Sequence, residues 1–247
     1  AIESIIEKEK PNIIINCGAM TNVDGCETNE AAAFRINAEG PKNLAEISKE
    51  KDIVLVHVST DYVFDGNGIC EAGKARPYVE TDPIDPKTVY GASKAKGEEY
   101  VSNIADKYFI VRTAWLYGDG NNFVKTMLKL AANHPQITVV SDQIGSPTST
   151  TDLAAAIIEL MQTKEYGLYH GTCEGQCSWY DFAVEIFNKS GVDVKVLPVT
   201  SEEFSSPTPR PKYSVLENKG LEDLKINVFR HWEAALTDYL KWLKDNQ

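Results

Sequence analysis

Residues 53–62 read IVLVHVSTDY, an apolar run that ends in a polar cluster. Its first six positions are apolar except for His57, without the polar alternation of a strand that faces water on one side. Such a run predicts a parallel strand that helices bury on both faces. The run stops at Ser59–Tyr62, four side chains that can all form hydrogen bonds. Because ligands bind beyond the carboxyl ends of parallel strands, we expect this polar cluster to face a ligand.

The same strand pattern recurs on both sides of this stretch. Apolar runs at Ile13–Ile15 and Phe109–Val111 predict two more buried strands. Helical patterns separate the strands, one over Glu30–Glu50 and another from near Tyr90 to Ala105. Strands that alternate with helices predict an α/β fold with a doubly wound, Rossmann-like parallel sheet.

The pattern becomes mixed around residue 140. Proline-rich stretches join helical patterns and brief strands, which cover residues 121–133, 151–163, 167–170, 178–189, 194–199 and 230–244. The segment Ser205–Pro211 must be extended, because each proline disfavours helical backbone in the residue before it. We therefore predict a larger sheet lobe over residues 1–140 and a smaller mixed α/β lobe over residues 141–247, with chain crossing between the two.

Composition excludes several classes of function. The chain has 247 residues, of which 43% are hydrophobic, enough for a large core. Lys and Arg total 25 against 36 Asp and Glu, and the net charge of -11 opposes binding to nucleic acid or to an anionic membrane. No apolar run approaches the roughly 20 residues of a membrane span. The first ten residues lack the pattern of a secretion signal, so we expect a cytoplasmic protein.

The five cysteines are scattered and odd in number, which disfavours a disulfide framework. Cys173 and Cys177 lie four residues apart near His170, so a zinc site is the alternative. Structural zinc sites need four closely placed ligands, and no second pair occurs. We therefore expect two packed thiols there and no metal ion.

A second polar cluster, YGASK, begins at Tyr90, thirty positions after Thr60. Tyr90 and Lys94 lie at i and i+4, so they share one face of the predicted helix. A lysine ammonium beside a phenol favours the phenolate, which predicts a lowered pKa for Tyr90 and makes it a candidate acid. The alternative is an exposed helix pair, with Ser59 and Thr60 as turn caps.

The sequence has no glycine fingerprint of the dinucleotide-binding type. Such sheets normally begin with a strand, a glycine-rich turn and a helix whose amino terminus holds the pyrophosphate. Neither GxGxxG nor GxxGxxG occurs in these 247 residues. A sheet without its middle strands would expose a large apolar surface, so we expect about fifty residues to precede Ala1 in the natural protein.

Six motifs carry a resemblance to a known family. They are NCGAMTNVDGCE (residues 16–27), INAEGPKNLA (36–45), VSTDYVFDG (58–66), VYGASKAKGE (89–98), RTAWLYGDGNNFVKTML (112–128) and SDQIGSPTSTTDLA (141–154). Their order resembles that of the dTDP-4-dehydrorhamnose reductases, in the extended short-chain dehydrogenase/reductase superfamily. The likeness extends from about residue 10 to Arg210–Pro211. The combination of STDYVF, RTxW and GNNF is far more selective than YxxxK.

The resemblance implies a reduction in which a nicotinamide cofactor delivers hydride to the C4 ketone of dTDP-4-dehydrorhamnose. The product would be dTDP-L-rhamnose, used in surface-polysaccharide synthesis. NADPH is the expected cofactor, with NADH as the alternative. Tyr90 would give a proton to the carbonyl oxygen, Thr60 would hydrogen-bond the developing alkoxide, and Lys94 would hold Tyr90 and the nicotinamide ribose. Residues 1–140 would form a partial dinucleotide-binding domain and residues 141–247 a substrate-binding lobe.

The matched motifs also imply further cofactor contacts. Gly18, Ala19 and Thr21 match the turn that passes the cofactor, where small residues allow close approach of the backbone. Val58 would lie beside the same cofactor.

Three residues match contacts to the sugar nucleotide. Asp61 would accept hydrogen bonds from sugar hydroxyls, Trp115 would form an apolar wall, and Arg210 would bind the diphosphate. Each has a structural alternative: Asp61 as a turn cap, Trp115 as a core residue, and Arg210 as an exposed loop residue.

Two other functions stay open at this stage. The β subunit of methionine adenosyltransferase is similar to these reductases but binds and modulates a partner enzyme. Retention of Thr60, Tyr90 and Lys94 favours catalysis instead. A reductase of another 4-keto deoxysugar nucleotide would keep the chemistry and change the substrate. The resemblance also implies a homodimer, and some relatives bridge subunits with Mg²⁺, which no pattern in this sequence indicates.

Overall fold

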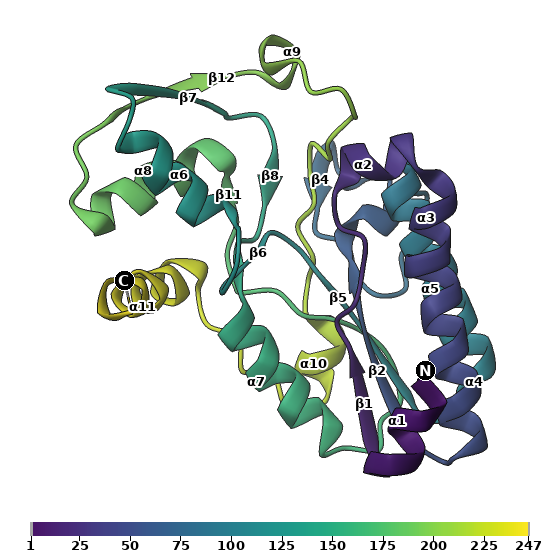
Figure 1. Cartoon of the computed structure of the whole chain (residues 1–247). Coiled ribbons are helices and arrows are strands. Elements are labelled where there is room, and N and C mark those ends of the chain that lie inside the picture. The colour runs from purple at the N-terminus through teal and green to yellow at the C-terminus, as the bar shows by residue number, and fades with distance from the viewer. Residues whose placement is uncertain (1, 247) are drawn as a thin grey trace.

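The computed structural model describes residues 2–246 and contains a four-stranded parallel sheet flanked by helices (Figure 1). The strands pair in the order β1 (Ile13–Asn16), β2 (Val54–Thr60), β5 (Tyr108–Thr113) and β10 (Gly167–His170). The predicted α/β fold with a Rossmann-like parallel sheet is therefore confirmed. β2 extends two residues beyond the predicted strand, so Ser59 and Thr60 belong to the strand itself.

Helices cover both faces of this sheet, as the apolar runs predict. α4 (Gly40–Glu50) and α5 (Val89–Ile104) lie on one face, and α7 (Thr150–Met161) lies on the other (Figure 1). Neighbouring residues of β2 point to opposite sides: Leu55 packs in the core cluster under α4 and α5, whereas Val56 packs in the cluster that includes α7. Both side chains are fully buried, which explains the absence of polar alternation.

The start of α5 is fixed by Thr88, whose Oγ1 accepts a hydrogen bond from the Gly91 N–H at 3.0 Å. Two glycines let α5 lie close against the backbone of other segments of the protein. A Cβ atom at Gly91 would be 2.1 Å from the carbonyl oxygen of Tyr62, and one at Gly97 would be 2.2 Å from that of Asn37. Because no side chain fits at these distances, α5 is held close to the polar end of β2.

The helix predicted over residues 30–50 is interrupted by a π-helical turn at Arg35–Glu39. This turn buries Asn37, whose Nδ2 donates hydrogen bonds to the Met20 carbonyl oxygen and to Ser93 Oγ, both at 3.0 Å. Single π turns often occur at functional sites. Here the turn ties the segment after β1 to α5.

The smaller lobe is built on a second, two-stranded parallel sheet. β7 (Gln136–Val140) pairs with β12 (Lys195–Val199), and both strands pack against α8 (Trp179–Ser190). Since β10 belongs to the main sheet, the chain passes between the lobes, and the boundary at residue 140 stays a prediction.

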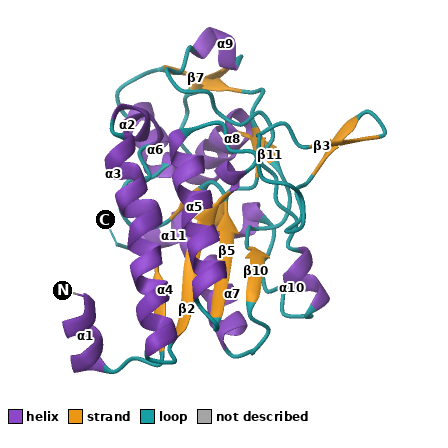
Figure 2. Ribbon diagram, turned by 90° about the vertical axis from the view of Figure 1, so that its right-hand side faces the viewer, coloured by secondary structure: helices purple, strands orange, loops and turns teal. Residues whose placement is uncertain are grey.

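Shorter elements complete the fold, and the hairpin that contains β3 projects from the body (Figure 2). The helices are α1 (Ile2–Glu9), α2 (Val23–Thr28), α3 (Glu30–Phe34), α6 (Phe123–Ala131), α9 (Ser201–Phe204), α10 (Lys219–Asp223) and α11 (Trp232–Asp245). The strands are β3 (Ile69–Glu71), β4 (Lys74–Arg76), β6 (Leu116–Tyr117), β8 (Ile144–Gly145), β9 (Thr148–Ser149) and β11 (Cys177–Ser178).

The cysteines are free thiols, and Cys173 and Cys177 are buried in the core, where burial raises the pKa of both. Within residues 2–246, no group of three or more His, Cys, Asp or Glu side chains is placed to hold a metal ion. In the same part of the chain, none of the helices combines the length and apolarity of a membrane crossing.

A buried ion pair fastens α5 to β5. The Nη2 and Nε atoms of Arg112 lie 2.7 and 2.9 Å from the carboxylate oxygens of Glu98, and the two side chains are only 4% and 6% exposed. The guanidinium also lies over the Phe64 ring, 5.0 Å from its centroid. Glu98 is one helical turn beyond Lys94, so this pair anchors the part of α5 that carries the lysine.

Candidate active site

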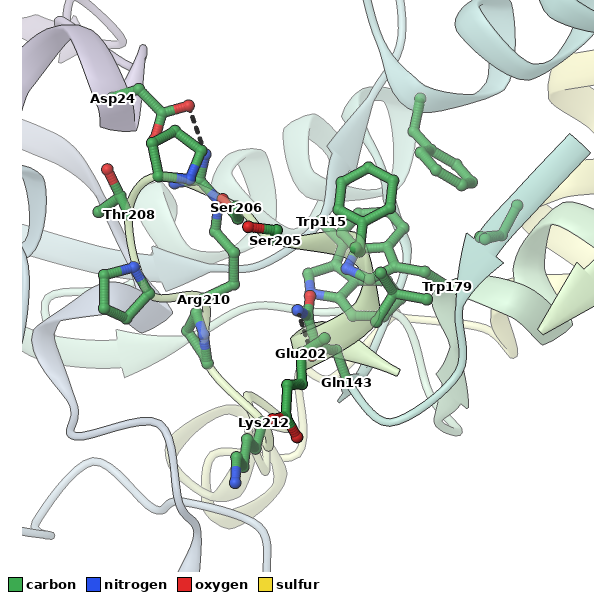
Figure 3. Close-up of a pocket in the computed structure, with 18 of the residues that line it drawn as sticks. Asp24, Trp115, Gln143, Trp179, Glu202, Ser205, Ser206, Thr208, Arg210 and Lys212 are labelled. Carbon is green, nitrogen blue, oxygen red and sulfur yellow. Dashed lines mark hydrogen bonds and ion pairs between the residues drawn. The ribbon is translucent and has the colours of Figure 1, made fainter. Parts of the chain in front are cut away.

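Two cavities meet at the carboxyl end of β2. The smaller cavity, about 660 Å³, is lined by the end of β2, α5, α7 and the segment after β1. The larger cavity, about 870 Å³, is lined by the smaller lobe and by Ser205–Pro211 (Figure 3). Asp61, Tyr62 and Trp115 line both cavities. The polar cluster that ends β2 therefore lies at the junction of two ligand-sized spaces.

Thr60 is the last residue of β2 and lines the smaller cavity. Its Oγ1 donates a hydrogen bond to Asp61 Oδ1 at 2.8 Å and accepts one from the Tyr62 N–H at 3.2 Å. The second contact caps a 3₁₀ turn over Asp61–Val63. Thr60 therefore caps a turn and also presents its hydroxyl at the junction.

The first two turns of α5 bring Tyr90 and Lys94 to the smaller cavity. The Tyr90 ring packs edge-on against Tyr62, with centroids 5.3 Å apart. Lys94 is only 2% exposed, and its Nζ donates a hydrogen bond to the Val58 carbonyl oxygen at 2.6 Å. The structure thus places Thr60, Tyr90 and Lys94 around one cavity, although they come from two separate elements.

Burial controls the pKa values of this group. It raises the pKa of Tyr90, because a phenolate is poorly solvated there, while a hydrogen bond with Thr60 acts in the opposite direction. Burial also lowers the pKa of Lys94 to about 8. The predicted lowering of the Tyr90 pKa by Lys94 is therefore wrong for this structure, since burial is the largest cause of the shift and Lys94 is not among its causes. A raised pKa keeps Tyr90 protonated at neutral pH, as a proton donor requires.

Trp115 forms a wall between the two cavities. Its indole stacks on Trp179 with ring centroids 3.5 Å apart and planes 6° apart, and its Nε1 donates to Ser214 Oγ at 3.1 Å. Its backbone φ is 48°, in a region that costs a non-glycine residue about 1–2 kcal/mol. A Cβ atom at Gly145 would lie 2.3 Å from the indole, so glycine makes room for the ring. Backbone strain of this kind is typical of functional positions.

Arg210 lies across the larger cavity from the two stacked tryptophans (Figure 3). Its Nη2 forms an ion pair with Asp24 Oδ2 of α2 at 2.9 Å, and the two residues are 186 positions apart in the sequence. Within residues 2–246, the buried Nη1 of Arg210 has no hydrogen-bond partner. Arg210 is therefore a fixed part of the cavity wall with one nitrogen free to bind an anion.

Comparisons with known proteins identify the family. Residues 1–244 match the family model described as the RmlD substrate binding domain. The crystal structure of a dTDP-4-dehydrorhamnose reductase from Clostridium acetobutylicum is 49% identical and has a TM-score of 0.94, over 99% of this chain and 85% of that one. The chain belongs to the dTDP-4-dehydrorhamnose reductase family. The family predicted from the six motifs is thus confirmed.

Two other similar proteins carry names or ligands that bear on the cofactor and the substrate. The structure of the Bacillus anthracis reductase in complex with NADP is 43% identical, with a TM-score of 0.91, over 96% of this chain and 83% of that one. A relative from Streptomyces niveus, named dTDP-4-keto-6-deoxy-D-glucose reductase, is 38% identical over 240 residues, which cover 96% of this chain and 81% of that protein.

In this member of the reductase family, small side chains line the smaller cavity on the side of β1. Ala19 and Thr21 come from the segment after β1, and Val58 comes from β2. Gly18 does not line the cavity, but its N–H donates a hydrogen bond to Asn16 Oδ1 at 3.1 Å and so fixes the turn. The predicted cofactor turn therefore borders the cavity, with Gly18 in a supporting position.

The smaller cavity also has polar groups that suit the nicotinamide ribose end of NADPH. Ser59 Oγ and Thr113 Oγ1 belong to residues that line it, and both atoms are buried without a hydrogen-bond partner in the described chain. Buried polar atoms are normally paired, so these hydroxyls are open to a polar ligand. Lys94 adds an amine for ribose hydroxyls. These residues fit a nicotinamide cofactor.

Asp61 carries a perturbed carboxyl group at the junction. Burial raises its pKa from the ordinary 3.8 to about 7, although the Thr60 hydroxyl donates a hydrogen bond that acts in the opposite direction. Its Oδ2 is buried without a hydrogen-bond partner in the described chain. Since Asp61 lines both cavities, a ligand hydroxyl would supply the missing partner.

Asp61→Asn is expected to raise the free energy of unfolding at pH 8 by up to about 4 kcal/mol, at about 1.4 kcal/mol per pKa unit. The unfolded carboxyl group ionises near its ordinary pKa of 3.8, whereas the folded one keeps its proton up to about 7. The parent protein therefore loses stability as the pH rises through this window. Urea unfolding near pH 4 and at pH 8 checks this. An equal difference between the two proteins at both pH values would contradict the buried-carboxyl account.

Tyr62 belongs to the Ser59–Tyr62 cluster, which was predicted to face a ligand, and it packs on Tyr90. Other residues of the two cavities were not predicted. Trp179 and Phe204 line the larger cavity from the smaller lobe, and no local pattern marks them. Asp24 holds Arg210, and only the folded chain brings the two together.

Proposed function

We propose that this chain catalyses the NADPH-dependent reduction of the C4 ketone of dTDP-4-dehydrorhamnose to dTDP-L-rhamnose. The observation that carries the proposal is the position of Thr60, Tyr90 and Lys94 around the smaller cavity, where it meets the larger one. A cofactor in the first space and a sugar nucleotide in the second would touch at this point. Relatives named dTDP-4-dehydrorhamnose reductases support the substrate, and the NADP complex of one supports the cofactor.

The residues at the junction have complementary roles in this reaction. Bound NADPH would supply the hydride that reduces the C4 carbon. Tyr90, protonated at neutral pH because burial raises its pKa, donates its proton to the ketone oxygen as negative charge develops there. Thr60 turns its hydroxyl hydrogen from Asp61 to the same oxygen and stabilises the alkoxide. Lys94 orients the cofactor through its ribose hydroxyls.

The larger cavity supports binding of the sugar nucleotide. Trp115 and Trp179 present apolar surface to a sugar ring, and Asp61 accepts a hydrogen bond from a sugar hydroxyl. Arg210 has a free Nη1, so it can bind a phosphate oxygen without releasing Asp24.

Arg210→Met is expected to raise the KM for the sugar nucleotide about 10- to 100-fold, since a hydrogen bond to a charged group contributes about 1.5–3 kcal/mol. The KM for NADPH should change little, because Arg210 lines the other cavity. Initial rates at varied concentrations of each ligand check both values. Asp24→Asn is the control: it removes the competing carboxylate and should lower the KM for the sugar nucleotide. An unchanged KM in Arg210→Met would refute the phosphate assignment.

The substrate itself is tested by a comparison of two 4-keto sugars. The first is dTDP-4-dehydrorhamnose, and the alternative is dTDP-4-keto-6-deoxy-D-glucose, which the name of the Streptomyces niveus relative supports. NADPH consumption is expected to show a kcat/KM at least tenfold higher for dTDP-4-dehydrorhamnose, the scale of one or two hydrogen bonds. The opposite preference would assign the alternative substrate. Binding of either sugar without NADPH consumption would favour the regulatory-subunit hypothesis.

The proposal retains two predictions made from the sequence, a homodimer and a cytoplasmic location. The homodimer rests on the family alone. Sedimentation equilibrium is expected to give twice the chain mass of 27.4 kDa. A mass of one chain would remove the dimer from the account and leave the proposed reaction in place.

A further inference from the structure

His57 is a buried titratable group that the proposed reaction does not use. It lies in the middle of β2, is 0% exposed, and is the polar interruption in the apolar run that precedes Ser59. In the sheet it pairs with Asn16 of β1, and on the side of α5 it faces Lys94. A buried imidazole between these two residues suggests a role in positioning the lysine.

Asn16 determines which nitrogen of His57 carries the proton. The Gly18 N–H can only donate, so the Asn16 atom that it meets at 3.1 Å must be the amide oxygen. The amide nitrogen of Asn16 therefore points to His57 Nδ1, at 3.0 Å. Since that nitrogen donates, Nδ1 must accept, and the proton of the neutral imidazole lies on Nε2.

His57 Nε2 faces Lys94 Nζ at 3.4 Å. A neutral amine can accept the Nε2–H through its lone pair while it donates to the Val58 carbonyl oxygen at 2.6 Å. An ammonium group has no lone pair, so its hydrogens would oppose the imidazole hydrogen.

We propose that His57 is a positioning residue for Lys94, held by Asn16 in the tautomer that directs Nε2–H at the lysine and disfavours its ammonium form. The hydrogen bonds from Gly18 through Asn16 and His57 thereby link the cofactor turn to Lys94. Any effect of this link on cofactor binding rests on the proposed function. The tautomer of His57 and the titration of Lys94 can be measured whether or not that function is correct.

The other charged groups around Lys94 favour its ammonium form, in opposition to His57, or are already paired. On α5 itself, Glu98 favours the ammonium but is bound to Arg112 of β5. Cys17, after β1, also favours the ammonium. Burial opposes it and brings the pKa of Lys94 to about 8, and burial keeps His57 neutral, with a pKa well below its ordinary value.

Tyr90 is the remaining titratable group near Lys94, one turn earlier on α5 and in the same cavity. Because its pKa is raised, it is uncharged when Lys94 titrates. A lysine that titrates near neutrality, rather than near its ordinary 10.5, would make cofactor orientation depend on pH in the working range.

The proposal is tested by NMR on the protein without cofactor, labelled with ¹⁵N-histidine and ¹³C,¹⁵N-lysine. The His57 and Lys94 signals are those that disappear in His57→Asn and Lys94→Met. We expect His57 to show an unprotonated Nδ1 and a protonated Nε2, and we expect Lys94 to titrate near 8. Protonation of Nδ1 in the parent protein would overturn the proposal.

Two variants test the effect on Lys94. Asn16→Ala removes the hydrogen bond that fixes the His57 tautomer, so Nε2 can accept a hydrogen bond from the Lys94 ammonium. His57→Asn keeps a hydrogen-bond partner for Asn16 but removes Nε2. Each is expected to raise the Lys94 pKa by about one unit, a tenfold change in its proton affinity. His170→Asn is the control: His170 is equally buried in the same sheet but contacts Tyr78 and Glu217.

The control His170→Asn should lower the stability of the protein without any shift of the Lys94 titration. An unmoved Lys94 titration in folded Asn16→Ala would overturn the proposal, even where His57→Asn is too unstable to measure. Asn16 is only partly buried, so its truncation leaves the core intact. If the titration shifts as expected in a protein that reduces neither sugar, the positioning role stands and the proposed function fails.

Discussion

Tyr90→Phe is expected to lower kcat for dTDP-4-dehydrorhamnose by about 100- to 10,000-fold, the usual contribution of a positioned proton donor. The change removes only the phenolic oxygen. The ring keeps its edge-on contact with Tyr62, so the fold and the shape of the cavity should persist. Dissociation constants for NADPH and the sugar nucleotide should therefore stay within about twofold of the parent values, because the proton moves only in the transition state. Single-turnover kinetics and calorimetry measure the two effects separately.

Tyr100→Phe is the matched control for this result. Tyr100 lies on the same helix, away from both cavities, and its hydroxyl makes a long 3.4 Å contact with Glu39. Its removal should leave kcat unchanged. Equal losses in the two variants would point to damage of α5. An unchanged kcat in Tyr90→Phe would refute the proton-donor assignment.

Glu98→Gln is expected to lower the free energy of unfolding by about 3–5 kcal/mol, the usual cost of breaking a buried ion pair. The substitution leaves the Arg112 guanidinium charged and almost fully buried, with no anionic partner on α5. It also weakens the attachment of α5 to β5 below Lys94, so NADPH affinity should fall along with stability. Urea unfolding at neutral pH measures the first effect, and calorimetry measures the second.

Glu99→Gln is the control, since Glu99 is exposed on the same helix and pairs with Lys96. Surface pairs contribute about 0–1 kcal/mol, so the change should be small. The double variant Glu98→Gln with Arg112→Met removes the uncompensated charge, and it should be more stable than Glu98→Gln alone. A double variant as unstable as the sum of both single changes would show that the two residues do not act as a pair.

Sequence patterns predicted the parts of the site that depend on local periodicity. The apolar run into Ser59 predicted β2 and its polar end, and the i, i+4 spacing predicted that Tyr90 and Lys94 share a face of α5. Parallel-strand geometry then places the end of β2 beside the first turn of α5. The same geometry predicts that Thr60, the last residue of β2, lies at the ligand edge of the sheet. These predictions hold because each depends on residues near one another in sequence or on the general geometry of parallel sheets.

Features that depend on packing between distant segments were not predictable from patterns. The Arg210 pair with Asp24 spans 186 positions, and the stack of Trp115 on Trp179 requires the smaller lobe to be in place. The direction of the Tyr90 pKa was also beyond the spacing argument. Spacing gave the position of Lys94 but not the degree of burial of Tyr90, which is the largest cause of its pKa shift.

Transfer of deuterium from the reduced cofactor to the sugar tests the proposed reduction at C4. NADPH labelled with deuterium at the transferred position would be incubated with this chain and dTDP-4-dehydrorhamnose, and the sugar product analysed by NMR and mass spectrometry. We expect dTDP-L-rhamnose with one deuterium at C4, and almost none of this product when Tyr90→Phe replaces the parent. Formation of no reduced sugar, or deuterium at a carbon other than C4, would contradict the proposed reduction.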